Sequence, residues 1–193
     1  FTNALTVNLD ATNINTVDAS AYTKVLTVAT TANILNDATH VLKGGTASDI
    51  LSITADSGAA ATVSGIVDIE NITVVGDAGT FAWTSHYNNA DTASTITVDA
   101  PSMSGGTKAA TINMVAENDA AVIVRGSAGD DTITMSASAL VDNISGNDGT
   151  DTIKFASANL TSLDVVDGGA GTDVLMATDE VAIVDADFTL VEN

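Results

Sequence analysis

The sequence predicts an all-β protein that forms one right-handed parallel β-solenoid, and three observations lead to this prediction. Short strand-forming segments recur along the chain, their aliphatic anchors recur at a nearly regular interval, and a glycine–aspartate turn is repeated three times toward the end. Repeats of roughly 20 to 50 residues are typical of stacked coil architectures. We therefore expect about nine coils in a single continuous domain spanning residues 1–193.

The strand-forming segments combine β-branched or aliphatic residues with alternating polar ones. Before the glycine-bearing repeats they are Ala4–Val7, Val25–Val28, Ile50–Ile53, Asn71–Val74, Thr95–Val98 and Thr111–Met114. Alternation directs one face of each strand toward a core. The expected inward anchors are Leu5, Leu26, Leu51, Ile72, Ile96, Ile112, Ile133, Ile153 and Leu175.

The spacing of these anchors averages about 21 residues, which is within the range of known coil repeats. The shortest step lies between Ile96 and Ile112, and the longest lies between Leu26 and Leu51. Such an interval fits one coil made of two or three short strands and the turns between them. Nine coils at roughly 4.8 Å each give a rod about 40 Å long. A β-sandwich, with a strand about every 8 to 12 residues, is the alternative, and the parallel repeat disfavours it.

A turn with the pattern G-x-x-G-x-D closes the strand in the last three repeats. Its leading glycines are Gly126, Gly146 and Gly168, and its aspartates are Asp131, Asp151 and Asp173. Glycine lets the backbone curl so that carbonyl oxygens point inward. A short carboxylate added to carbonyl oxygens makes a flexible oxygen cage, which suits calcium better than magnesium.

This pattern resembles the nonapeptide G-G-x-G-x-D-x-U-x of the RTX family. Residues 168–176 match it at every position, whereas Asn147 and Ser127 replace the second glycine in the other two copies. The resemblance implies a β-roll with calcium held between adjacent turns by carbonyls and the sixth-position aspartate. The family's densest rolls repeat the nonapeptide without interruption and bind metal along both edges. Here the interval between copies is more than twice as long, so we expect metal along one edge only. The alternative is a solenoid whose glycine–aspartate turns bind no metal.

The expected calcium ligands lie in these turns. They are Gly126, Ala128, Asp130, Asp131, Gly146, Asp148, Asp151, Gly168, Ala170 and Asp173. A fourth turn, residues 44–52, keeps Gly44, Gly45 and Asp49 in register but has Ala47 where the second turn glycine belongs. We regard Gly44, Thr46 and Asp49 as a further candidate site or a decayed repeat. The chain thus divides into metal-poor coils (1–121), calcium-binding coils (122–177) and a terminal coil (178–193).

Charge and composition exclude several classes of binding site and partner. The net charge is −20, and the acids are 21 Asp and only 4 Glu, so they favour turns and short metal ligands. A surface this acidic repels nucleic acid. Cysteine is absent, which excludes disulfides and cysteine-bound zinc, and no apolar run is long enough for membrane insertion. The first residue is Phe1 rather than Met, as expected of an excerpt or a processed chain.

Catalytic motifs are not found in the sequence. His40 and His86 fit no metal or triad pattern, and the paired acids Asp130 and Asp131 fall inside a turn, so we expect no enzyme activity. The segment Phe81–Asp91 holds three of the seven aromatic residues. We weigh two interpretations of it, a surface loop that contacts a neighbouring molecule and a cluster that covers an open flank of the coil.

Proteins that look like this one include bacterial surface-layer proteins and large adhesins exported by type I secretion. The expected function is therefore a structural, calcium-binding part of a secreted cell-surface protein that self-assembles into a lattice or filament. Cell-surface polysaccharide is a further candidate partner. The alternative is an RTX folding and secretion module of a larger enzyme, toxin or adhesin. A threonine-lined ice-binding face is disfavoured, because outward threonines do not recur at one place in every coil.

Overall fold

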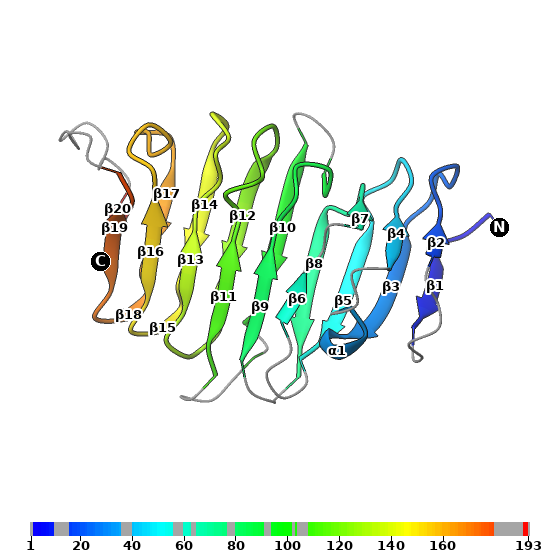
Figure 1. Cartoon of the computed structure of the whole chain (residues 1–193), viewed down its shortest axis with the longest axis horizontal. Coiled ribbons are helices and arrows are strands. Elements are labelled where there is room, and N and C mark those ends of the chain that lie inside the picture. Colours follow the sequence, from blue (N-terminus) through cyan, green and yellow to red (C-terminus); the bar gives the residue numbers. More distant parts are fainter. Residues whose placement is uncertain are drawn as a thin grey trace.

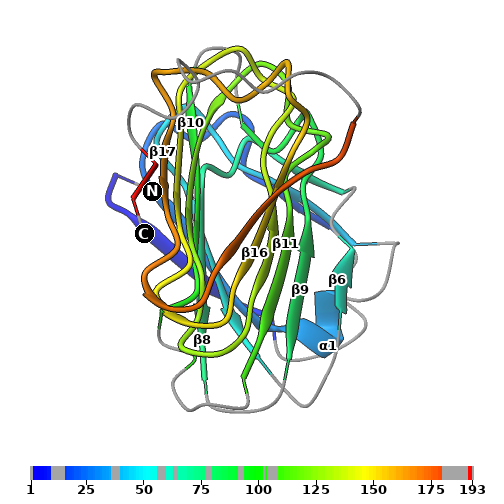
Figure 2. The same cartoon turned by 90° about the vertical axis from the view of Figure 1, so that its left-hand side faces the viewer.

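The computed structural model of this chain is a parallel β-solenoid with almost no helix. It describes residues 2–9, 16–35, 40–55, 60–62, 65–76, 80–90, 94–101, 103, 108–179 and 191–192. Two sheets face each other across an apolar interior and run along the length of the molecule (Figures 1 and 2). We call them the long sheet and the short sheet.

The long sheet has nine strands, all paired in parallel. In spatial order they are β1 (Leu5–Asn8), β3 (Leu26–Thr31), β5 (Ile50–Thr54), β8 (Asn71–Val75), β10 (Thr95–Asp99), β12 (Ala121–Arg125), β14 (Asp142–Ser145), β17 (Val165–Asp167) and β20 (Val191–Glu192).

The short sheet has six strands, also paired in parallel. They are β6 (Ala60–Thr62), β9 (Phe81–Thr84), β11 (Ala110–Asn113), β13 (Thr132–Thr134), β16 (Thr152–Phe155) and β19 (Val174–Ala177). About six turns of the solenoid therefore have both walls in the described part of the chain. The count of nine coils stays a prediction.

Two smaller sheets form where the chain turns between the walls. A three-stranded sheet contains β2 (Thr16–Asp18), β4 (Val41–Lys43) and β7 (Ile66–Val67), and a two-stranded sheet contains β15 (Asp148–Gly149) and β18 (Ala170–Gly171). They lie at opposite ends of the coils, with β4 and β7 at the top of Figure 1 and β15 and β18 at the bottom. We call the segments from the long to the short sheet the motif edge, and those that lead back to the long sheet the return edge.

Alternation of residue type explains why these segments form strands. In β10, for example, Ile96 and Val98 are fully buried, while the polar residues between and beside them are partly or fully exposed. β-branched side chains pack well on such a half-buried surface, and each fully buried aliphatic side chain stabilises the fold by about 2 kcal/mol. The inward residues of both sheets form one continuous core along the solenoid.

The predicted register is correct at five of the eight anchor steps, but Leu51 pairs with Val28 rather than Leu26, and Ile72 pairs with Val98 rather than Ile96. Leu5 pairs with Leu26, Leu51 pairs with Ile72, and the last four predicted anchors pair in sequence as Ile112, Ile133, Ile153 and Leu175. The prediction that the short interval between Ile96 and Ile112 is one coil is wrong. Ile96 lies in β10 of the long sheet and Ile112 in β11 of the short sheet, so the chain crosses between walls within this interval.

The aromatic segment Phe81–Asp91 is only partly a loop. Its first four residues form β9, and Phe81 and Trp83 are 1% and 0% exposed in the core. Tyr87, by contrast, is exposed on the return edge and stacks at a tilt on His86, with ring centroids 4.3 Å apart. Of the two interpretations weighed from the sequence, the surface loop is therefore wrong for Phe81 and Trp83, because the alternation of bulky and small residues buries both rings in the core. Asp91 lies outside the described residues.

The one helix among the described residues, α1 (Ala32–Leu35), lies beside β6 at the end of the short sheet that is nearer the N-terminus (Figure 1). It contacts β6 and β3 and buries Ala32, Ile34 and Leu35. The sequence offers no obvious cap at either end of the solenoid, yet α1 packs against β6, the outermost strand of the short sheet. No sequence pattern indicated this helix, because a single helical turn is too short to show a helical period. The predicted terminal coil, 178–193, lies largely outside the described residues.

Candidate metal-binding turns

The three predicted turns occupy equivalent places on the motif edge. Each one leads from the long sheet to the short sheet, after β12, β14 and β17 respectively. The second and third are in direct register, because Asp148 and Gly149 of β15 pair with Ala170 and Gly171 of β18. The sequence prediction that these turns stack in successive coils is therefore confirmed for this pair.

The sixth-position aspartates form a ladder between coils. The Oδ1 atom of Asp173 accepts the backbone N–H of Asp151 at 3.0 Å, and Oδ1 of Asp151 accepts the backbone N–H of Asp131 at 2.7 Å. Oδ1 of Asp131 continues the series by accepting the N–H of Ala110 at 2.5 Å. Each carboxylate thus extends the parallel hydrogen bonding past the end of the strands. Sequence reasoning assigned these residues to metal alone and missed this second role.

The second turn provides an oxygen with no donor. Asp151 is 0% exposed, and its Oδ2 atom has no hydrogen-bond partner in the described part of the structure. The same is true of Oδ2 of Asp173 in the third turn. An unpartnered buried carboxylate oxygen is costly unless a proton or a cation meets it.

The leading glycine of the second turn lies against these oxygens. A methyl group on Gly146 would overlap both Asp151 Oδ2 and the carbonyl oxygen of Gly168 in the next coil, so the two oxygens lie close together. The second motif position has left-handed backbone in both turns, with φ of 76° at Asn147 and 91° at Gly169. Asparagine tolerates this conformation better than most residues, which explains its presence there.

The first turn differs from the other two in the hydrogen bonds that its aspartate accepts. Both oxygens of Asp131 are hydrogen-bonded within the protein, since Oδ2 accepts the Ser127 N–H at 2.5 Å and Oδ1 accepts the Ser127 hydroxyl at 2.6 Å as well as the Ala110 N–H. The carbonyl of Gly126 accepts the Asn147 side-chain amide at 2.8 Å. The protein itself therefore supplies donors where the resemblance places metal.

The remaining predicted ligands lie around these atoms. Asp130 is exposed and its Oδ1 accepts the Thr150 N–H at 2.8 Å, and Asp148 and Ala170 are exposed while Ala128 is half-buried. Their backbone carbonyls belong to the stacked turns, but the structure by itself does not identify them as ligands, and these assignments stay predictions.

Burial and neighbouring carboxylates both raise the pKa values of the aspartates in these turns. Burial raises the pKa of Asp151 to about 6, and the neighbouring carboxylates of Asp131 and Asp173 contribute to the rise. Burial also raises the pKa of Asp131. A bound cation would offset both the burial of these charges and the repulsion between them.

A calcium ion is compatible with the donor set between the second and third turns. Asp151, Asp173 and the carbonyl of Gly168 offer hard oxygen ligands, of which two are buried carboxylate atoms without donors in the described structure. No group of three or more His, Cys, Asp or Glu side chains is arranged for metal binding within the described ranges. A metal here would therefore depend on backbone carbonyls and water for its remaining ligands.

The fourth predicted turn, at Gly44, is not a member of this stack. It leads from β4 of the three-stranded sheet to β5 of the long sheet, so it lies on the return edge (Figure 1). Asp49 is 0% exposed and both its oxygens are occupied, Oδ1 by the Leu26 N–H at 2.7 Å and Oδ2 by the Gly45 N–H at 2.5 Å. Its glycines and aspartate resemble the motif because β4, like β17, is a strand that ends at a turn.

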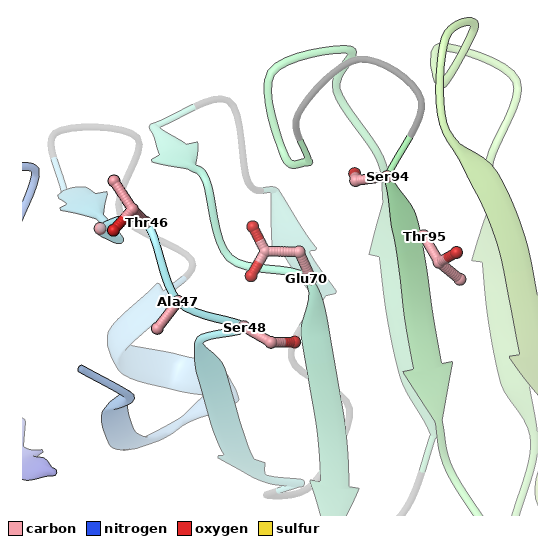
Figure 3. Close-up of a pocket in the computed structure, with 7 residues that line it drawn as sticks. Thr46, Ala47, Ser48, Glu70, Ser94 and Thr95 are labelled. Atoms are coloured by element: carbon pink, nitrogen blue, oxygen red, sulfur yellow. The ribbon is translucent and has the colours of Figure 1, made fainter. Parts of the chain in front are cut away.

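Glu70 lies one coil after Asp49 and accepts a hydrogen bond from its backbone. Its Oε2 atom accepts the Asp49 N–H at 2.8 Å, and its carboxylate points toward the 46–48 segment (Figure 3). Together with Thr46, Ser48, Ser94 and Thr95 it lines an open pocket of about 320 Å³. The pocket offers hydroxyl groups and one carboxylate, and none of its lining residues is aromatic.

A further buried pair on the return edge was not singled out from the sequence. Asp142 and Asp164 are each 2% exposed, and Oδ1 of Asp164 accepts the Asp142 N–H at 2.8 Å. Burial raises the pKa of Asp142 to about 6, and the Asp164 carboxylate contributes. A signal did exist, because Asp142 and Asp164 lie one coil interval apart in the sequence.

Comparisons with protein-family models, curated proteins and solved structures found no match. Among the described residues no helix has the length and hydrophobicity that a membrane crossing requires.

Proposed function

We propose that this chain is a structural, calcium-binding β-solenoid of a secreted bacterial cell-surface protein. The observation that carries the proposal is the pair of buried Oδ2 atoms, on Asp151 and Asp173, that have no hydrogen-bond donor among the described residues of two stacked turns. The RTX-like sequence of those turns supports calcium as the ion. The carbonyl of Gly168 is a further ligand, and calcium would neutralise the carboxylates and join consecutive coils.

In this proposal calcium stabilises the right-handed solenoid, with about nine coils, mainly at its C-terminal coils. A site with a Kd of roughly 0.1 to 1 mM contributes on the order of 1 kcal/mol at millimolar calcium. Because each aspartate of the carboxylate ladder also links two coils, we expect the molecule to keep part of its order without the ion. Low intracellular calcium would keep the last coils loose before export by type I secretion.

Circular dichroism and thermal unfolding, followed during a calcium titration, test this proposal. We expect the β signal and the midpoint of unfolding to rise with calcium and to fall again in chelator. Magnesium at the same concentration is the control, because its smaller octahedral shell fits a carbonyl-rich cage poorly. An unfolding curve that is the same in calcium and in chelator would refute calcium binding.

Self-association into a surface layer or filament is the second part of the proposal. β1 is the edge strand at the N-terminal end of the long sheet, where it pairs with β3 alone among the described strands. Its inward residues Leu5 and Val7 are only half-buried. An edge of this kind is a template for another chain. Electron microscopy with and without calcium tests it, and dispersed monomers at high protein concentration in millimolar calcium would count against it.

The alternative is an RTX-type folding module or adhesin segment of a larger secreted protein. It shares the calcium turns but needs no self-association, so microscopy separates the two proposals. We assign no catalytic role to any residue of either edge, and we retain cell-surface polysaccharide as a proposed partner of the assembled layer.

A further inference from the structure

The segment that joins β11 to β12, residues 114–120, carries a buried carboxylate away from the motif turns. Glu117 is 0% exposed, and its backbone is held on both sides. Its N–H donates to the Met114 carbonyl at 2.9 Å, and its carbonyl accepts the N–H of Ala137 in the next coil at 2.9 Å. The segment lies on the return edge, at the opposite end of the coils from β15 and β18 (Figure 1).

The two carboxylate oxygens of Glu117 have different surroundings. Oε1 accepts three backbone N–H groups, from Asn118 at 3.1 Å, Asp119 at 3.3 Å and Ala120 at 3.2 Å. Oε2 has no hydrogen-bond partner within the described structure. Because the three bonds to Oε1 fix the carboxylate, Oε2 stays buried. An ionised oxygen in this position is unfavourable unless a positive charge or a proton meets it.

A second carboxylate lies next to the first. The Asp119 side chain is within hydrogen-bonding reach of the Glu117 carboxylate, and burial, together with Asp119, raises the pKa of Glu117. Asp119 is half-buried, and the neighbouring Asn118 is exposed, so one side of the pair faces solvent. Two carboxylates with water on one side are the ligand set that a hard divalent cation prefers.

We propose that Glu117 and Asp119 form a cation site for a hard divalent ion such as calcium, separate from the motif turns. Oε2 of Glu117 and the Asp119 carboxylate are its protein ligands, and water completes the coordination on the exposed side. The segment leads directly into β12, which is followed by the first motif turn. A cation here would therefore fix the coil on which the motif turns stack. The inference does not depend on calcium binding at those turns.

Calcium binding to the full chain, measured by isothermal titration calorimetry and equilibrium dialysis, tests this site. The parent for the test is Asp151→Asn/Asp173→Asn, which removes the charged ligands of the motif turns and keeps an oxygen for each ladder bond. We expect this parent to retain one bound calcium ion, and Glu117→Gln added to it to lose that ion. Asp164→Asn is the matched control and leaves the ion bound, because both Asp164 oxygens already accept N–H groups, from Asp142 at 2.8 Å and Thr161 at 2.7 Å.

Thermal unfolding separates loss of the ion from loss of the fold. Glutamine keeps an acceptor for the three N–H groups, so in chelator Glu117→Gln unfolds at the same temperature as its parent or higher. If Glu117→Gln does not fold, Asp119→Asn replaces it.

The inference is overturned if the Asp151→Asn/Asp173→Asn parent binds no calcium, or if calcium still binds after Glu117→Gln and Asp119→Asn are each added to it. The role of the Glu117–Asp119 pair would then be to share a proton. Calcium binding by the wild-type chain that only Asp151→Asn/Asp173→Asn abolishes refutes this site alone. Binding that only Glu117→Gln abolishes refutes the motif turns alone.

Discussion

The backbone N–H of Asp151 donates to Oδ1 of Asp173, the residue at the same motif position one coil later, at 3.0 Å. Oδ2 of Asp173 is buried and has no donor among the described residues, so one carboxylate connects two coils and, in our proposal, also offers an oxygen to a cation. The two roles can be separated by substitution, because asparagine keeps one acceptor oxygen but removes the charge.

The first prediction concerns which aspartates bind calcium. We expect Asp151→Asn and Asp173→Asn each to weaken calcium binding roughly tenfold or more, because each removes a charged ligand. Asp131→Asn should change the affinity less than about threefold, because both Asp131 oxygens already have donors within the protein. Calorimetry of the three variants measures this. Equal losses in all three would show that the first and second turns hold an ion as well.

The second prediction concerns Asp49. Replacing it with alanine leaves the N–H groups of Leu26 and Gly45 without their acceptor, at a cost of about 1 to 3 kcal/mol for each buried group. We therefore expect Asp49→Ala to lower the free energy of unfolding by roughly 2 to 5 kcal/mol. Denaturant unfolding in chelator and in calcium measures it. The loss should be the same in both, and a loss that appears only in calcium would mean that this turn binds the ion.

The third prediction is a pH dependence that arises from Asp142. Its pKa is about 6 in the folded protein against an ordinary value of 3.8, so the folded state binds the proton more tightly. The stability from this group is fully present below pH 3.8 and is lost as the pH rises through 6. Between pH 7 and pH 5 we expect it to add about 1 kcal/mol to the free energy of unfolding.

Asp142→Asn tests this assignment, because asparagine can accept the Ser136 N–H and donate to the Ser136 hydroxyl, both of which Asp142 contacts at 3.1 Å. The variant should have a flatter dependence of stability on pH in chelator than the wild type. An unchanged slope would place the titration elsewhere, with Asp151 as the next group to substitute.

The fourth prediction uses Trp83, the single tryptophan of the chain. Its side chain is 0% exposed in β9, two strands away from β13 along the short sheet. We expect short-wavelength emission that acrylamide quenches poorly, and that stays unchanged when chelator lowers the β signal, because the motif turns at which we propose calcium binding all follow β12. A red shift on adding chelator would instead show that calcium supports the whole solenoid.

The coil and much of its register follow from local features of the sequence. Alternation of Ile, Val and Thr defines the buried face, and the regular anchor interval already pairs Ile112 with Ile133 and Ile153 with Leu175. Both are local properties, since a strand's inward face follows from its own residues and a regular coil repeats at a fixed chain length. The glycine–aspartate turns are also visible in the sequence, because each turn is formed by a few consecutive residues.

The wall that each strand joins, and the donors that meet each carboxylate, depend on the tertiary structure. Ile96 and Ile112 have the same local pattern but lie in opposite sheets. The sequence around Phe81 and Trp83 is compatible with a loop, and only the pairing of β9 with β11 shows that these residues form a strand. Asp49 and Asp151 occupy similar motifs, yet the Gly45 N–H meets Oδ2 of Asp49, whereas Oδ2 of Asp151 has no partner among the described residues. The strand pairings and the carboxylate ladder join residues one coil apart, so the path of the chain around the solenoid, and not the local sequence, brings donor and acceptor together.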